Sequence, residues 1–96
     1  MPSILLQSRL KPAPEVLSRE MDGETVILNP ETGIYFGLDP IGTQIWHLIQ
    51  EQKTLESVCE SLAQDYAVKK SRCQKDVFKL ASDLYKSGIV EISSKK

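Results

Sequence analysis

The sequence predicts a small α+β domain of the winged-helix-like kind, with a three-stranded antiparallel β-meander followed by three α-helices. Two observations predict it. Short β-rich runs separated by turn signals fill residues 16–38, and apolar residues recur at helical spacing after them. The chain has 96 residues, which suits one domain with a modest core. Three short helices can cover the single face of a small sheet that needs burial.

Three strands are predicted, joined by two tight turns. Asp22-Gly23 is typical of a two-residue hairpin loop, and the strand after it is rich in β-branched residues. The second turn is the segment NPETG, in which proline presets one backbone angle and glycine accepts a positive one. The predicted strands are residues 16–21, 24–29 and 34–38.

Capping signals mark where the three helices start and stop. Asp39-Pro40 opens the first helix, because Asp39 can accept backbone N–H bonds and proline suits the first helical position. Thr54 is the expected N-cap of the second helix, and Ser71–Gln74 fits a capping box that opens the third. Gly88 is expected to follow the end of the third helix.

Each predicted helix carries an apolar stripe that should face the core. Trp46 flanks the first stripe and is expected to pack between the helices and the sheet. The two cysteines lie on the second and third stripes with no other metal ligand nearby, which predicts buried free thiols. The stripes are Ile41, Ile45, Leu48 and Ile49; then Leu55, Val58, Cys59, Leu62, Ala63 and Tyr66; then Cys73, Val77, Leu80, Ala81 and Leu84.

The two ends of the chain carry weaker signals. Residues 1–15 contain three prolines and little periodicity, so they are expected to form an N-terminal arm or edge segment. Residues 16–92 form the predicted domain, in which residues 89–92 add a short extended segment. Residues 93–96 are the expected C-terminal tail.

The charge of the chain is nearly balanced but unevenly spread. A formal net charge of −1 gives no overall attraction to nucleic acid or to an anionic membrane. Residues 1–68 hold four basic and ten acidic side chains, a net of −6, whereas residues 69–96 hold eight basic and three acidic ones, a net of +5. The early apolar run is too short for a signal peptide or a membrane span, so a cytoplasmic protein is expected.

The sequence offers little for catalysis. It contains one histidine, His47, on the first predicted helix, and a lone histidine has no positioned partner for acid–base work. Nucleotide-binding, zinc-protease and serine-hydrolase motifs are absent from the sequence. We therefore expect no enzymatic activity, no cofactor and no metal.

Nucleic-acid binding is the alternative that the third helix raises. This helix stands in the recognition-helix place of a winged-helix fold, and its basic residues would be rewarded by counterion release. Asp76 and Asp83 oppose this reading because they add negative charge to the same helix. Asp83 is also spaced to pair with Lys79 and Lys86. The basic residues are Lys69, Lys70, Arg72, Lys75, Lys79 and Lys86.

Peptide binding is the sharper hypothesis, since the edge of a small meander can accept another strand. Gly37 would leave the surface of the last strand open for a close backbone. One of the neighbouring aromatic residues, Tyr35 or Phe36, should face outward, and the sequence leaves open which one. Phe78 lies off the main stripe of the third helix, so it either lines a groove or widens the core.

The segment from Gly23 to Ile92 resembles the PqqD-like family of leader-peptide recognition domains, also called RiPP recognition elements. The pattern GxYFGLDxxGxxIW is similar to that of the stand-alone recognition proteins of lasso-peptide pathways. The resemblance covers most of the chain and leaves out the N-terminal arm. It runs through Gly23–Asn29, Gly33–Asp39, Gly42–Trp46, Thr54-Leu55 and Ser87–Val90.

The resemblance implies a cofactor-free protein that binds the leader segment of a ribosomally made precursor peptide. The leader would add as a strand to the third strand of the meander, with the third helix as the other wall, and would be presented to a protease or another modifying enzyme. The basic third helix suits a leader with acidic residues. The implied peptide contacts are Ile34, Tyr35, Phe36, Gly37 and Leu38 from the strand, and Arg72, Lys75, Asp76, Phe78, Lys79 and Asp83 from the helix.

Overall fold

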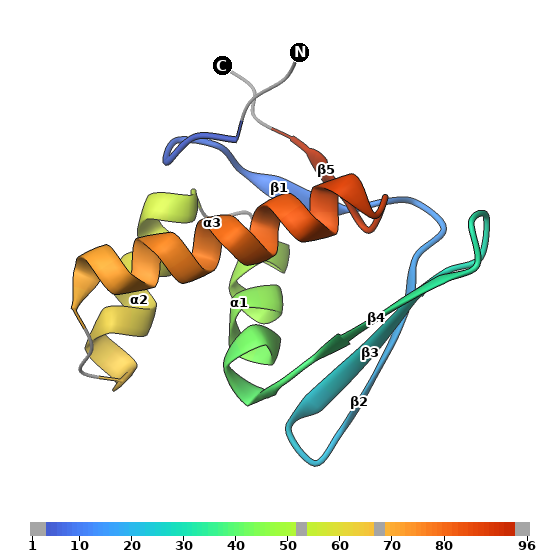
Figure 1. Cartoon of the computed structure of the whole chain (residues 1–96), viewed down its shortest axis with the longest axis horizontal. Helices are drawn as coiled ribbons and strands as arrows, with labels where there is room; N and C mark the ends of the chain where they lie inside the picture. The colour runs from blue at the N-terminus through green and yellow to red at the C-terminus, as the bar shows by residue number, and fades with distance from the viewer. Residues whose placement is uncertain (1–3, 52–53, 67–68, 94–96) are drawn as a thin grey trace.

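The computed structural model describes residues 4–51, 54–66 and 69–93, and it confirms the α+β fold with its meander and three helices (Figure 1). The helices gather on one side of the three-stranded sheet, and α3 crosses in front of α1 in this view. The elements in chain order are β1 (Leu10–Pro12), β2 (Leu17–Met21), β3 (Glu24–Asn29), β4 (Ile34–Leu38), α1 (Pro40–Gln50), α2 (Leu55–Tyr66), α3 (Lys70–Lys86) and β5 (Val90–Ile92).

Two antiparallel sheets are present. The larger has the order β2-β3-β4, so β3 is central and β2 and β4 are its two edges. The smaller pairs β1 with β5, and its Leu10 is fully buried in the core. Part of the segment expected as an N-terminal arm is thus a paired strand, which the sequence did not indicate. The division into arm, domain and tail otherwise stays a prediction.

Both predicted turns are confirmed by their backbone geometry. Asp22 and Gly23 have φ angles of 54° and 81°, as a two-residue I′ loop requires. In the second turn the Gly33 N–H donates to the Asn29 carbonyl at 2.8 Å, and Gly33 has a φ of 76°. The Asn29 side chain also accepts a bond from the Glu31 N–H and donates to the Gly88 carbonyl at 2.9 Å. Asn29 thereby ties this hairpin to the loop before β5.

The helix caps agree with the sequence in three of four places. The Asp39 carboxylate accepts the Gly42 N–H at 2.7 Å, and Thr54 Oγ1 accepts the Ser57 N–H at 3.2 Å. After α3, the N–H groups of Gly88 and Ile89 donate back to Tyr85 and Leu84, a glycine-based closure.

The predicted capping box at Ser71–Gln74 is wrong. The helix α3 already begins at Lys70, and its N-cap is Lys69, which makes no side-chain capping bond. Because the helix begins two residues earlier than Ser71 as N-cap would require, Ser71 lies inside the first turn, where it cannot act as the cap.

The core lies where the three helices meet the inner face of the sheet. Trp46 is 3% exposed, and both cysteines are buried free thiols, as predicted. The buried hydroxyls of Thr25 and Thr43 lie 2.8 Å apart and join β3 to α1. Ile41 departs from the prediction, because it belongs to the first apolar stripe but is 46% exposed.

Candidate functional site

The register of the sheet determines which backbone N–H and C=O groups of β4 point away from β3. A two-residue loop closes on a hydrogen-bonded pair, here Met21 with Glu24, and such pairs alternate with non-bonded ones along antiparallel strands. Val26 therefore points its N–H and C=O groups toward β2. Gly37, which lies opposite Val26 on the other side, then points its own N–H and C=O groups away from β3. The same holds for Tyr35, so β4 offers two residues to a further strand.

The side chains of β4 alternate between the two faces of the sheet. Tyr35 is 70% exposed on the outer face, whereas Phe36 is partly buried and packs against the core. This answers the question that the sequence left open between these two aromatics. Ile34 and Leu38 share the inner face with Phe36, because the side-chain period of a strand is two. None of the five residues of β4 carries a charge.

A groove separates β4 from α3, with the start of α1 as its floor. It contains a hollow of about 430 Å³. Two predicted strand contacts and one predicted helix contact, Gly37, Leu38 and Asp76, line this hollow together. The hollow is lined by Gly37, Leu38, Asp39, Ile41, Gly42, Ile45, Asp76 and Leu80, which we call the β4–α3 groove.

Sequence analysis missed several members of the β4–α3 groove. The groove wall also contains three residues that the sequence predicts for the core stripes of their helices: Ile41, Ile45 and Leu80. A stripe at helical spacing cannot distinguish a side chain that is covered by the sheet from one at its border. A second hollow of about 310 Å³ continues from this wall toward α2, where Tyr66 and Arg72 line it.

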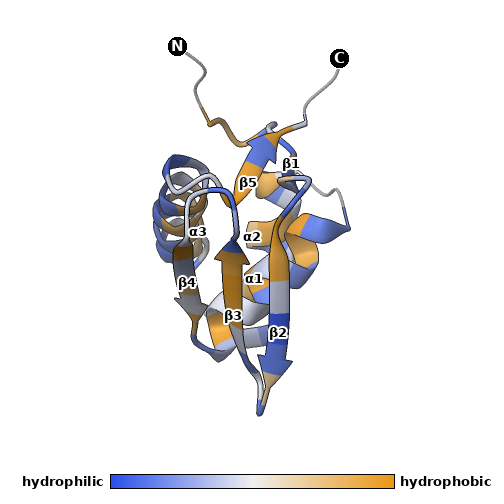
Figure 2. Cartoon of the chain, turned by 90° about the vertical axis from the view of Figure 1, so that its right-hand side faces the viewer, coloured by the Kyte–Doolittle hydropathy of each residue, from blue (hydrophilic) through white to orange (hydrophobic). Residues whose placement is uncertain are grey.

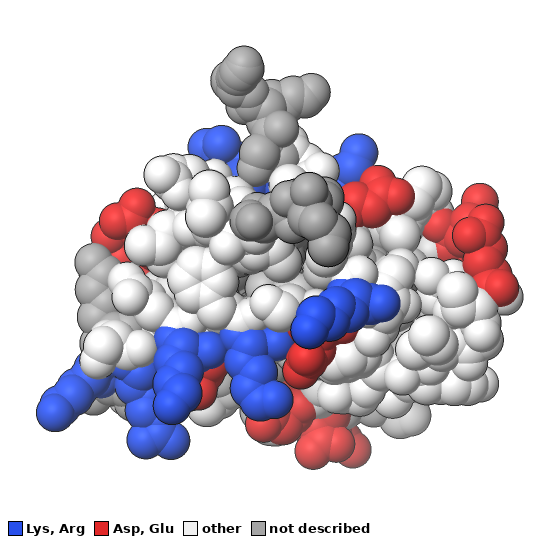
Figure 3. Space-filling view, turned by 45° about the horizontal axis from the view of Figure 1, so that its top comes forward, with Lys and Arg blue, Asp and Glu red and all other residues white. Residues whose placement is uncertain are grey.

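Two ion pairs form within α3, and of their four side chains only Asp76 lines the β4–α3 groove, whereas Arg72 lines the second hollow and Lys79 and Asp83 line neither. Arg72 Nε lies 3.8 Å from an Asp76 carboxylate oxygen, and Lys79 Nζ lies 3.8 Å from one of Asp83. All four groups are substantially exposed, so these pairs contribute little stability. The Lys79–Asp83 pair confirms one of the pairings expected from the spacing. Lys and Arg side chains gather in this region with carboxylates directly beside them (Figure 3).

Phe78 lies on a different side of α3 from the groove. It follows Asp76 by two positions, which is roughly 200° around a helix. Phe78 is partly buried and packs against the core cluster. The contacts therefore favour the core reading of Phe78 over the groove reading. Lys75 is exposed and does not line either hollow beside α3. The roles of all these residues in peptide contact stay predictions.

Other chemistry receives no support from the described side chains. His47 Nε2 lies 2.8 Å from Glu20 Oε1, a contact between α1 and β2 on the opposite edge of the sheet. Among the residues that the structure describes, no three or more His, Cys, Asp or Glu side chains are grouped to hold a metal ion. Within those same ranges, no helix has the length and apolar character that a bilayer crossing requires.

Comparison with known proteins places the chain in a family. The family model described as coenzyme PQQ synthesis protein D (PqqD) matches residues 24–90. Comparison with curated proteins gives no match.

Two solved structures resemble the chain along nearly its whole length. TbiB1 in complex with the TbiA(beta) leader peptide is 30% identical, covers 90% of this chain and 99% of its own, and has a TM-score of 0.80. A lasso peptide synthetase B1 complexed with the leader peptide is 20% identical and covers 86% of this chain and 98% of its own. Its TM-score of 0.79 supports the fold. On the family match and the first of these structures together, this chain belongs to the PqqD family.

Proposed function

We propose that the protein binds the leader segment of a ribosomally synthesised precursor peptide as an additional strand on β4. The observation that carries this proposal is the uncharged edge of β4, whose Tyr35 and Gly37 backbone N–H and C=O groups point away from β3. Strand addition gains affinity from main-chain hydrogen bonds and selectivity from pockets that take alternate side chains. The hollow beside Leu38 and Leu80 is such a pocket.

The relatives support the same ligand class. Both of these similar solved structures were determined with a leader peptide, and one of them is 30% identical to this chain. Within this proposal the protein acts without chemistry of its own. It presents the precursor to a separate processing enzyme, in the first place a leader peptidase, in the cytoplasm.

A lasso-peptide pathway is the proposed setting. Gene neighbourhood tests this part: a short precursor gene beside a transglutaminase-like protease gene and an asparagine-synthetase-like cyclase gene would support it. A neighbourhood with a different modifying enzyme would move the protein to another pathway while leaving the peptide-binding proposal intact.

The binding proposal is tested by amide hydrogen exchange with the synthetic leader of the neighbouring precursor. The amides of Tyr35 and Gly37 should become protected on binding, because a new strand would accept their hydrogen bonds. The amides of Ser18 and Glu20, at the β2 edge, are the internal control and should not change. Calorimetry without heat, together with unchanged spectra at high peptide excess, would contradict the proposal.

DNA binding through α3 remains the second reading, and the ion pairs weaken it. Arg72 and Lys79 each have a carboxylate within 4 Å, and this negative charge would face the phosphates as well. Only weak, sequence-independent binding is expected, and it should vanish near physiological salt. A tight and sequence-selective gel shift at that salt concentration would overturn the peptide proposal.

A further inference from the structure

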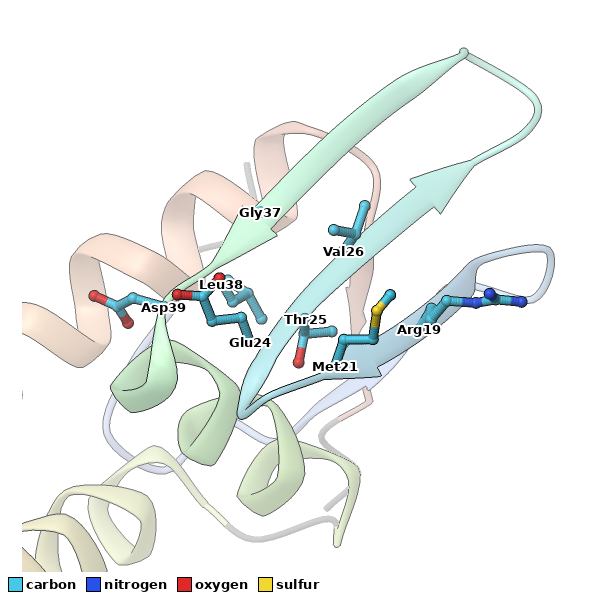
Figure 4. A pocket seen from close by; sticks show the side chains of 8 residues that line it. All are labelled: Arg19, Met21, Glu24, Thr25, Val26, Gly37, Leu38 and Asp39. Carbon is cyan, nitrogen blue, oxygen red and sulfur yellow. The ribbon is translucent and has the colours of Figure 1, made fainter.

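The sheet carries a hollow on each face beside β4, and the two are built differently. The outer hollow, of about 400 Å³, is lined by the meander and Asp39 alone (Figure 4). Gly37 leaves it uncrowded, because a Cβ atom built there would meet nothing within 4 Å. Figure 2 views this open face directly, with apolar residues on all three strands. The β4–α3 groove, in contrast, exists only if α3 is held at a suitable distance from β4.

Direct packing between β4 and α3 contributes little to that distance. Among the described residues, the meander packs on α1 through β3 and β4, whereas α3 packs chiefly on α2 and β5. The groove therefore runs between two parts of the fold that are supported separately. The start of α3 adds no polar anchor, because its N-cap Lys69 makes no side-chain capping bond.

A hydrogen bond from a buried side chain ties the two walls together at one end. Asn29 pairs across the hairpin with Ile34, the first residue of β4, and its Nδ2 donates to the Gly88 carbonyl at 2.9 Å. Gly88 lies two residues beyond Lys86, where α3 ends. Asn29 is 6% exposed, so water competes little for this bond. The start of β4 and the end of α3 are thus joined through one side chain.

The chemistry of this tie requires an asparagine. Oδ1 must accept, because it receives the Glu31 N–H at 2.9 Å and holds the turn. Nδ2 must donate, because it faces the Gly88 carbonyl. An aspartate would turn an acceptor toward that carbonyl, and an alanine would lose both bonds. Gly88 fits the same arrangement, since a Cβ atom built on it would lie 3.2 Å from Nδ2.

Packing does not replace the tie, because open space lies beside it. A hollow of about 510 Å³ is bordered by both Asn29 and Gly88. The rest of its lining comes from the β1–β2 connection, the hairpin turn and β5. Once the bond is broken, the loop after α3 has room to move on that side without meeting a packed neighbour.

We propose that Asn29 is a positioning residue that sets the distance between β4 and α3, and thereby how tightly the groove holds a peptide. The inference rests on the proposed strand addition to β4. Asn29 belongs to the central strand β3, so it lies one strand away from the added peptide and acts through the helix wall. Without the tie, fewer molecules have a closed groove, and the apparent affinity falls by that fraction.

Asn29→Asp tests the tie with the smallest change of shape. The carboxylate keeps an acceptor for the Glu31 N–H but loses the donor to Gly88. Calorimetry with the synthetic leader of the neighbouring precursor should show roughly 3- to 10-fold weaker binding, as for one unmade hydrogen bond. Thr54→Ala is the matched control. It removes the N-cap bond of α2 and destabilises the domain, yet the folded protein should bind the leader unchanged.

Acid should rescue Asn29→Asp, which it would not do for a general loss of stability. Protonation gives the introduced carboxyl an O–H that can donate to the Gly88 carbonyl, and burial raises its pKa above about 4. Glu15, Glu31 and Glu91 line the neighbouring hollow and titrate in both proteins. The readout is therefore the ratio of variant to original affinity at each pH. This ratio should return toward one as the pH falls.

A second variant and a measurement without peptide cover the case in which Asn29→Asp folds poorly. Gly88→Asn attacks the tie from the other side, because asparagine tolerates the φ of 76° while its Cβ crowds Nδ2. It should weaken leader binding in the same direction. Residual dipolar couplings of the free protein should show α3 reoriented relative to the meander in both variants, and unchanged in Thr54→Ala.

The outcomes separate this inference from the proposed function. Normal leader affinity in both folded tie variants would overturn the inference and leave strand addition standing. Weakening that Thr54→Ala shares, or that acid fails to reverse in Asn29→Asp, would point to a general loss of stability and overturn it as well. No leader binding by the original protein would contradict the proposed function. Unchanged dipolar couplings would then overturn the inference independently.

Discussion

Among the described residues, neither edge of the main sheet, β2 or β4, has a second partner strand, but the two edges differ in composition. The sequence of β2 is LSREM, with Arg19 and Glu20 adjacent, whereas β4 reads IYFGL and is uncharged. Charged residues on an edge are a common protection against pairing with other chains. The helix α3 adds a second difference, because it walls the β4 side through Asp76 and Leu80.

The difference between the edges teaches how one sheet can offer a single docking strand. Exposed backbone groups alone would make both edges sticky. At β2 an ordinary peptide would meet the charges of Arg19 and Glu20. At β4 it would meet apolar side chains, a hollow on each face, and a glycine that permits close approach.

Proline substitution at the two edges should produce the largest difference in leader affinity. Gly37→Pro removes an N–H that points to the free edge, so leader affinity should fall by roughly 10- to 100-fold, as for an unmade buried hydrogen bond. Ser18→Pro is the matched control, since Ser18 holds the equivalent outward position on β2. Circular dichroism must show that both variants fold. Equal leader affinity for the two folded variants, measured by calorimetry, would contradict the assignment of β4.

Phe78→Ala tests whether Phe78 belongs to the core side of α3 or to its groove side. Because Phe78 packs against the core and is only partly buried, its removal should destabilise the domain by about 2 kcal/mol, below the range for a fully buried phenylalanine. Urea unfolding measures this loss. Leader affinity of the folded fraction should stay unchanged. Weakened binding at undiminished stability would instead return Phe78 to the groove.

Lys79→Glu tests how far charge contributes beside β4. An acidic leader should bind several-fold more weakly, and a rim position predicts that the change falls mainly on the association rate. The helix itself should lose at most about 0.5 kcal/mol from the new repulsion with Asp83. Neither Lys79 nor Lys86 lines a hollow, and Lys86→Glu, the same charge reversal seven residues further along the helix, is the control. If Lys79→Glu abolishes binding while folded Gly37→Pro binds normally, the contact is centred on the helix.

Removing the charges of β2 should have the smallest effect. The double variant Arg19→Thr, Glu20→Thr should self-associate weakly, because its edge then resembles β4. Sedimentation velocity at rising concentration measures this. The pair Asp65→Thr, Lys69→Thr removes the same charges from exposed positions outside the strands and should stay monomeric. Monomers throughout for the β2 variant would mean that these charges do not protect the edge.

The sequence predicted the fold well where local signals are strong. The Asp22-Gly23 loop, the Asp39-Pro40 helix start and the Gly88 closure each follow from backbone preferences of one or two residues, and the structure has all three. It did not indicate β1, because Leu10–Pro12 is short and its pairing with β5 is set by residues at the far end of the chain.

The site was predictable in part for the same reason. The strand contacts of β4 follow from an apolar segment between two clear turns. Whether Tyr35 or Phe36 faces outward depends on register, which the hairpin loops set and which alternation alone leaves ambiguous. The groove members Ile41 and Leu80 depend on how α1 and α3 cross, which no local pattern encodes.

The pairing of β1 with β5 brings the first and last strands of the domain to the same end of the molecule. The first and last strands pair in one small sheet, which lies toward the top of Figure 1, while the C-terminal end of β4 and the start of α1 lie on the opposite side. Another polypeptide joined at either strand would leave the β4 edge open.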